Sequence, residues 1–216
     1  MKIQRPDFPE PLDITDHLST YLERAIENED DIVNSHFINL KPEEYNAPSI
    51  EFHHCLFEKS NLSSSHFNRA YFADITFSQC DLSNINFNDT TFHRVIFDDC
   101  KLLGADFNNS IFEDCSFNDC MAKFFNGSSS KLKHLLFKHC DLTSGSFQDC
   151  RLKNVHFEDC DLSQIDFFQT ALKGIDFTSN TLQGWLLSGD YELKGATFNF
   201  LQAVELSKLL GIIVKN

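Results

Sequence analysis

FADITFSQCDLSNINFNDTTFHRVIFDDCKLLGADF, residues 72–107, carries a Phe or Leu at every fifth position, counted from its first residue. The same spacing runs from Phe52 to Leu187 without insertion or deletion, and of its 28 central positions only Ala122 and Gly127 are not Phe or Leu. An amphipathic helix repeats about every 3.6 residues and a strand about every 2, so a spacing of five fits neither. It indicates a repeat architecture built from short structural units.

A second period of 20 residues groups four of these pentads. One column of central positions is Phe in every repeat, whereas another is Leu wherever it is large: Phe57, Phe77, Phe97, Phe117, Phe137, Phe157 and Phe177 against Leu62, Leu82, Leu102, Leu142, Leu162 and Leu182. We interpret each 20-residue repeat as a closed coil of four short sides, stacked on the next coil. The residue two before each central one is mostly small or apolar, which predicts a second inward position: Ile50, Cys55, Ser60, Ser65, Ala70, Ile75, Cys80 and Ile85 begin this series.

The stacked coils predict a rod with a filled interior. At a strand spacing of roughly 4.7–4.9 Å, the span from Phe52 to Leu187 would be about 34 Å long. Because Phe and Leu fill its centre, we expect no natural pocket. The two ends would expose unpaired backbone and must be covered.

Composition limits the function classes. A chain of 216 residues fits one domain, and its net charge of −14 argues against nonspecific binding to nucleic acid or an anionic membrane. The charge favours a basic partner, or serves solubility alone. No apolar run approaches the ~18–20 residues that span a bilayer, and the start MKIQRPDFPEPLD has no apolar signal core. We therefore expect a cytoplasmic protein without membrane contact.

The eight cysteines all fall on the second inward position: Cys55, Cys80, Cys100, Cys115, Cys120, Cys140, Cys150 and Cys160. Five of them recur every 20 residues, so parallel stacking would place them one coil apart. That separation exceeds the ~3.5–4.5 Å between Cβ atoms in a disulfide. We predict reduced thiols that act as small apolar fillers. The His residues are scattered over outward positions, so no metal site is expected.

Three segments depart from the repeat. Residues 1–31 lie outside it and predict a short helix through Leu18, Leu22 and Ile26, capped by Thr15 or Asp16. Residues 32–49 predict an irregular first coil that covers the N-terminal end of a β-helix over 32–187. Within the β-helix, 121–131 leaves two central sites nearly empty, and we expect Phe125 to fill the space and the Ser/Gly run to bulge or bend. That segment is either a packing compromise or an adaptable partner contact.

Residues 188–216 predict a helix followed by a short strand. Asn199 is a candidate N-cap, Gln202 lies where a capping box places it, and Gly211 lies where a helix ends. The apolar residues of this segment predict either an end cap or a two-fold dimer: Ala203, Leu206, Leu209, Leu210, Ile212, Ile213 and Val214.

Placing the chain on the 20-residue repeat gathers carboxylates along one corner, here called the acidic corner: Glu58, Asp81, Asp98, Asp99, Asp119, Asp141, Glu158, Asp159 and Asp161. The eight from Asp81 onward are the candidate partner-binding residues. Seven of them lie within about three coil steps, roughly 15 Å, which is about 2 Å per charge against ~1.7 Å in duplex DNA. Lys101 and Lys138 dilute this charge. Another side is basic, with Lys131, Lys133, Arg151, Lys153 and Lys173. No catalytic motif accompanies these charges, so we predict neither an enzyme nor a cofactor.

The pentads resemble those of the pentapeptide-repeat family, whose signature A-[D/N]-[L/F]-x-x reads here as CDLSN (80–84), ADFNN (105–109), CDLTS (140–144), CDLSQ (160–164) and IDFTS (175–179). The resemblance covers about two thirds of the chain. It implies an all-β fold, a right-handed quadrilateral β-helix, with a C-terminal capping or dimerisation helix.

The C-terminal segments LKGIDFTSNTLQGW (172–185) and NFLQAVELSKLLGIIV (199–214) resemble the ending of the Qnr-type quinolone-resistance proteins, and the absence of long loops resembles their chromosomal Gram-positive relatives. This resemblance implies an acidic rod that mimics DNA, binds DNA gyrase and topoisomerase IV, and protects them from quinolones. It also implies a homodimer through Ala203, Leu206, Leu209, Leu210, Ile212 and Ile213, with no direct binding of nucleic acid. The alternative is a pentapeptide-repeat scaffold or immunity protein with a different partner.

Overall fold

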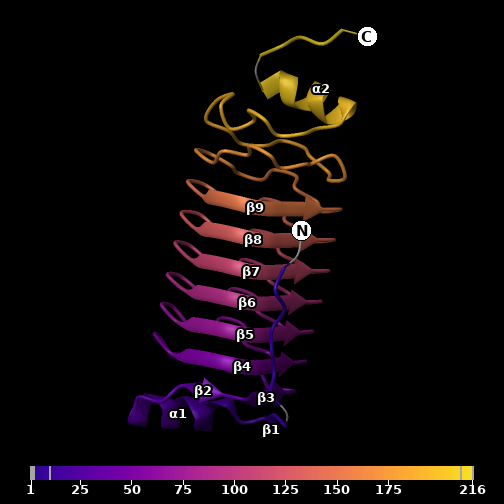
Figure 1. The fold of residues 1–216 in the computed structure, drawn as a ribbon. Helices are drawn as coiled ribbons and strands as arrows, with labels where there is room; N and C mark the ends of the chain where they lie inside the picture. The colour runs from indigo at the N-terminus through magenta and orange to yellow at the C-terminus, as the bar shows by residue number, and fades with distance from the viewer. Residues whose placement is uncertain (1–2, 10, 210, 216) are drawn as a thin grey trace.

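The chain forms a parallel β-solenoid in which the strands of successive coils lie one above another (Figure 1). The computed structural model describes residues 3–9, 11–209 and 211–215. Six strands of eight residues start 20 residues apart: β4 (Glu51–Glu58), β5 (Tyr71–Ser78), β6 (Thr91–Asp98), β7 (Ile111–Asn118), β8 (Lys131–Lys138) and β9 (Arg151–Glu158). Each pairs in parallel with the next at an offset of 20, as in Phe57 opposite Phe77. The predicted all-β solenoid is confirmed.

The corners of each coil are left-handed turns. Every fifth residue from Ser49 to Gly174 has a positive φ, so each 20-residue coil has four corners and the outline is a quadrilateral. The left-handed conformation costs about 1–2 kcal/mol for an ordinary L-residue, and Gly, Asn and Asp tolerate it best. The polar outward positions of the pentads therefore also supply the corners.

Stacked aromatic rings form the centre of the rod. Phe97 and Phe117 lie with ring centroids 4.4 Å apart and nearly parallel planes, and both are fully buried. The eight cysteines are free and buried, as predicted. Each thiol donates a hydrogen bond to a backbone carbonyl. Cys80 Sγ, for example, donates to the carbonyl of Phe57 in the preceding coil at 3.4 Å. Burial raises the pKa of Cys55 and of Cys115 to about 12, so these thiols stay protonated.

The segment 121–131 keeps the regular coil, so the expected bulge or bend is wrong. Asn126 still bridges to its partners 20 residues away on both sides. Phe125 is 1% exposed and stacks between Phe107 at 4.9 Å and Phe147 at 5.4 Å, which confirms that it fills the space above Gly127. The ring reaches the column from the neighbouring inward position, so the backbone does not need to change.

A helix, α1 (Leu18–Asn28), covers the N-terminal end of the rod (Figure 1). Leu18, Leu22 and Ala25 are buried against the first coil, whereas Ile26 is 57% exposed, which corrects the expected apolar face. The N-cap is His17 rather than Thr15 or Asp16, and no side chain caps the helix. Residues 32–49 lie in register with the next coil, as expected of a first coil, but the element that covers the end of the rod is α1.

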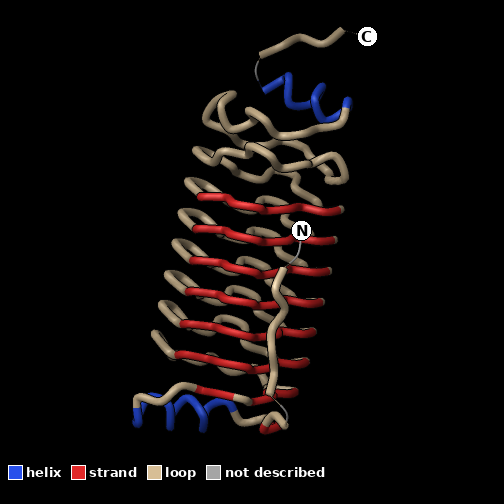
Figure 2. Tube along the Cα trace, in the orientation of Figure 1, coloured by secondary structure: helices blue, strands red, loops and turns tan. Residues whose placement is uncertain are grey.

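Three short strands lie at this end of the rod, two of them in the first coil and one, β1, before α1. They are β1 (Asp13–Thr15), β2 (Ile32–Val33) and β3 (Ser35–Ile38). β1 pairs in parallel with β3, and both β2 and β3 pair with β4. The strands on one side, shown in red in Figure 2, therefore form a single continuous sheet.

The C-terminal end is covered by α2 (Phe200–Leu209). The capping box is confirmed, because Gln202 N–H donates to Asn199 Oδ1 and Asn199 N–H donates to Gln202 Oε1. Gln202 Nε2 also donates to the carbonyls of Phe177 and Asn180, which satisfies acceptors of the last coil. Gly211 adopts φ +73° after the helix. The predicted strand at 212–214 is absent, since these residues pair with no strand among those described.

Candidate interaction surfaces

The coil places the acidic-corner residues on adjacent positions of one edge. Asp98 and Glu158 end β6 and β9, while Asp99, Asp119 and Asp159 occupy left-handed corners. Asp81, Asp141 and Asp161 follow the corner, on the column of bridges that runs through Lys101 and Met121. The 20-residue repeat therefore brings together residues that are distant in sequence, as predicted.

Basic groups interrupt this edge more than the sequence suggested. Lys101 Nζ lies 3.8 Å from Asp81, and Lys138 lies in register beside Glu158. Sequence reasoning missed His139, which lies between the carboxylates of Asp119 at 3.2 Å and Asp159 at 3.7 Å. It also missed Lys123, 3.4 Å from Asp141. An offset of 20 links His139 directly to Asp119 and Asp159, so the signal for His139 was present.

The remaining carboxylates affect one another. Partial burial raises the pKa of Asp98, and the nearby carboxylates of Asp119 and Asp99 raise it further. Partial burial opposes ionisation at Asp141 too, but hydrogen bonds from Thr143 and the charge of Lys123 lower its pKa overall. Negative charges thus repel one another around Asp98, whereas Lys123 and Thr143 stabilise the carboxylate of Asp141.

A second charged column lies beneath the N-terminal segment, which runs along the rod and crosses its strands in Figure 1. Residues 3–9 cross several coils here, and we call them the strap. Gln4 N–H donates to Asp114 Oδ1 and Asp7 N–H donates to Asp74 Oδ1. Asp74 and Asp114 are buried, and Arg94 forms a two-point ion pair with Asp74.

Charge pairing stabilises this column. Burial opposes ionisation of Asp74, but the Arg94 guanidinium and the Asp7 N–H lower its pKa overall. Sequence reasoning missed the column, because nothing in the first residues indicates that they return along the rod. The strap covers this corner, whereas Asp99, Asp119 and Asp159 of the acidic corner are exposed.

The C-terminal end presents exposed apolar residues. Among the predicted dimer contacts, Ala203 is exposed, as are Leu209, Ile212 and Ile213 at 48%, 53% and 84%. Leu206 is 5% exposed because it packs on its own rod, so it is not available to a second copy. Leu210 lies outside the described residues.

Two further apolar residues at this end were missed. Phe200 and Leu201 are 80% and 76% exposed, at the start of α2. They directly follow the predicted N-cap, which was the available signal. Together with Leu209, Ile212 and Ile213 they form an exposed apolar surface on and just after α2.

One group among the described residues could hold a metal ion: Asp31, Glu51 and His53. His53 Nε2 already lies 3.4 Å from a carboxylate oxygen of Glu51 and 3.7 Å from one of Asp31, and both carboxylates are exposed. The contact between His53 and Glu51 is within hydrogen-bond distance, and exposed acidic groups of this kind are common on surfaces without an ion.

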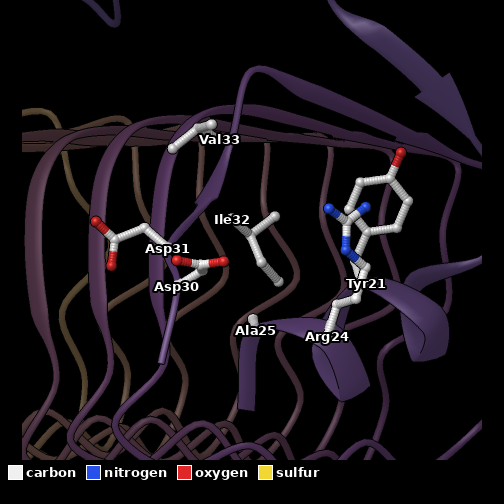
Figure 3. Close-up of a pocket in the computed structure, with 7 residues that line it drawn as sticks. All are labelled: Tyr21, Arg24, Ala25, Asp30, Asp31, Ile32 and Val33. Carbon is white, nitrogen blue, oxygen red and sulfur yellow. The ribbon is translucent and has the colours of Figure 1, made fainter. Parts of the chain in front are cut away.

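A small hollow of about 170 Å³ lies beside α1. Figure 3 shows Tyr21 and Arg24 on one side of Ile32, with Asp30 and Asp31 on the other. Its lining residues are Tyr21, Arg24, Ala25, Asp30, Asp31, Ile32 and Val33. These residues do not place a nucleophile beside a base, so the hollow is not a candidate catalytic site.

The repeating coil, its filled interior and its charged edges define a solenoid of the kind that presents side chains to partners along its length. A family model described as "Pentapeptide repeat region" matches residues 50–123 and 130–207. The chain therefore belongs to the pentapeptide-repeat family, as its pentads predicted. No helix among the described residues is long and apolar enough to cross a membrane.

Comparison with curated proteins finds no match. Among solved structures, the chain is similar to trypsin-treated QnrB1, a plasmid-mediated fluoroquinolone resistance protein, at 21% identity over 87% of this chain and 92% of that one, with a TM-score of 0.33. It is also similar to HetL from the cyanobacterium Nostoc sp. strain PCC 7120, a pentapeptide-repeat protein involved in the regulation of heterocyst differentiation. That identity is 11% over 82% of this chain and 92% of HetL, with a TM-score of 0.33. Similarity at this level carries no functional argument.

Proposed function

We propose that this chain is a Qnr-like, DNA-mimicking protein that binds DNA gyrase and topoisomerase IV in the cytoplasm and protects them from quinolones. It would act by binding alone, without a catalytic step or a cofactor. Membership of the pentapeptide-repeat family and the Qnr-like C-terminal sequence support the proposal. The observation that carries it is the acidic corner, because a DNA-binding enzyme offers a basic surface that such an edge fits.

The charge density of the corner is of the right order. Seven carboxylates between Asp98 and Asp161, with Lys101, Lys123 and Lys138 among them, leave four net negative charges. Over three coil steps of ~4.7–4.9 Å this is about one net charge per 4 Å, close to the ~3.4 Å between phosphates along one DNA strand. The corner therefore matches a single phosphate strand better than a whole duplex.

A homodimer through the C-terminus completes the proposal. The exposed Phe200, Leu201 and Ile213 lie on and just after α2, at the C-terminal end of the rod. Large apolar groups left in water favour association with a second copy. Pairing of two ends would double the length of the acidic edge.

A supercoiling assay with purified gyrase, with and without ciprofloxacin, tests the proposal. Wild type should restore supercoiling in the presence of the drug. Replacing Asp99 and Asp159 by Lys should abolish that effect, because both lie on the acidic corner. Replacing Asp89 and Asp149 by Lys is the matched control, since both are exposed corner aspartates with positive φ on a different edge. Protection that survives the first pair of reversals would contradict the role of the corner.

The dimer has a separate test in light scattering. Ile213→Asp should yield a monomer at micromolar concentration, because it places a charge in the apolar end. Ile111→Asp is the control, since Ile111 is also exposed, at 40%, but lies on β7. A wild-type monomer would contradict the dimer and leave the topoisomerase assay unaffected.

The second candidate is a scaffold or immunity protein with another partner. The basic groups that interrupt the acidic corner, Lys101, Lys123, Lys138 and His139, favour it. If wild type neither inhibits gyrase nor rescues it from the drug, this second function replaces the first.

A further inference from the structure

Phe124 occupies a backbone position that suits no phenylalanine. Its φ is +59°, and every other described residue with positive φ is glycine or carries a polar or charged side chain. The equivalent corners of the two adjacent coils hold Gly104 and Ser144. A bulky residue in the left-handed region is strained, and such strain often marks a functional site.

The chain itself gains little from this ring. Phe124 is 60% exposed, whereas its neighbour Phe125 is 1% exposed and fills the core. Among the aromatic pairs of the described residues, none includes Phe124. The strain and the exposure are both unfavourable for the isolated chain, so the benefit must come from a contact outside it.

Two further exposed apolar residues lie on the coil of Phe124 or on the adjoining coil. Leu103 is 46% exposed and Met121 is 54% exposed. Gly104 N–H donates to the carbonyl of Lys123 at 2.9 Å, which sets the corner after Leu103 directly against the corner that contains Phe124. We call Leu103, Met121 and Phe124 the apolar patch.

The apolar patch adjoins the acidic corner. Met121 lies in the same column of bridges as Asp81 and Asp141, between Lys101 and Asp141. The ion pairs Lys101–Asp81 and Lys123–Asp141 flank it. Apolar groups surrounded by charged pairs are the usual composition of an interface centre and its rim.

We propose that the apolar patch inserts into an apolar hollow of the basic protein that binds the acidic corner, with Phe124 as its anchor. This inference rests on the proposed function, because the patch and the corner lie on one continuous surface and would contact the same partner. Aromatic anchors at the centre of an interface commonly account for most of its affinity. The acidic corner would then orient the partner and speed its association, and the apolar patch would lengthen the lifetime of the complex.

Affinity for purified gyrase and thermal unfolding, measured on the same variants, test the proposal. Phe124→Asn relieves the strain, because Asn84 occupies the equivalent corner of another coil. It should raise Tm by about 2–4 °C, as expected for relief of strain in a chain of this size. The same variant should weaken binding to gyrase by at least about tenfold. Phe168→Gln is the control, since Phe168 is also exposed, at 43%, and should bind like wild type.

The outcomes separate this inference from the proposed function. If Phe124→Asn binds gyrase like wild type, the proposed role of the apolar patch is contradicted, while the proposed role of the acidic corner is unaffected. A lower Tm for Phe124→Asn means that the ring supports the chain's own fold, and also contradicts the role of the apolar patch. If wild type itself does not bind gyrase, the proposed function fails and the patch fails with it.

Discussion

Moving the aromatic ring from Phe125 to position 127, the next inward position, tests the packing of the rod most directly. Phe125 stacks on Phe107 and Phe147 and meets Phe117 and Phe137 edge-on at 5.8 and 5.9 Å. A Cβ on Gly127 would lie 2.8 Å from the Phe125 ring. The ring of Phe125 therefore fills the space that, in the neighbouring coils, is filled by the Phe at the central position of the pentad.

The three variants should differ sharply in stability. Phe125→Ala removes a fully buried ring and should cost about 3–5 kcal/mol. At roughly 2–4 °C per kcal/mol, Tm should fall by about 6–20 °C. Gly127→Phe alone forces a second ring into the same space and should cost at least about 1–3 kcal/mol.

The double variant, Phe125→Ala with Gly127→Phe, should recover most of the loss. It gives this coil the arrangement of its neighbour, in which Ala105 precedes Phe107. Circular dichroism can monitor unfolding by heat and by urea for wild type, the two single variants and the double variant, which together make a double-mutant cycle. A double variant less stable than Phe125→Ala would refute the reasoning, since the two sites would then not share one space.

Three other outcomes follow from the same structure. Because the folded state lowers the pKa of Asp74, Asp74→Asn should destabilise the chain at neutral pH, and its difference in Tm from wild type should shrink as the pH falls below about 4. Gln202→Ala should leave the carbonyls of Phe177 and Asn180 without their donor, and hydrogen exchange should show faster opening of α2 with little change in the central strands. The buried thiols should resist a thiol reagent at pH 8 in the folded chain, and all eight should react after unfolding; fast reaction of the native chain would contradict their burial.

Local repetition made the central part of the fold predictable. The ring of Phe57 stacks on Phe37 and on Phe77, one coil away on either side, because each coil contacts only its neighbours. The same simplicity predicted the buried cysteines and the replacement of a central ring by Phe125. The capping box at Asn199 and Gln202 was also predictable, since it depends on residues three apart.

Contacts over long distances in the sequence were the ones that could not be predicted. The strap meets Asp74 and Asp114 across 67 and 110 residues, and no period links them. The burial of Leu206 depends on how α2 is oriented on the last coil, which the helical pattern alone does not determine. The coil at 121–131 stays regular because backbone pairing on both sides outweighs the local preference of Ser and Gly for a bend.

The amino-acid sequence by itself determined the coil, its four sides, the inward residues and the gathering of carboxylates on one edge, because each follows from a strict period in which near neighbours decide the packing. Only the tertiary structure decided which corner the strap covers, which lysines and which histidine lie against the carboxylates of the acidic corner, and which apolar residues remain exposed. Those features depend on the docking of segments outside the period and on side-chain directions, and neither is encoded by spacing alone.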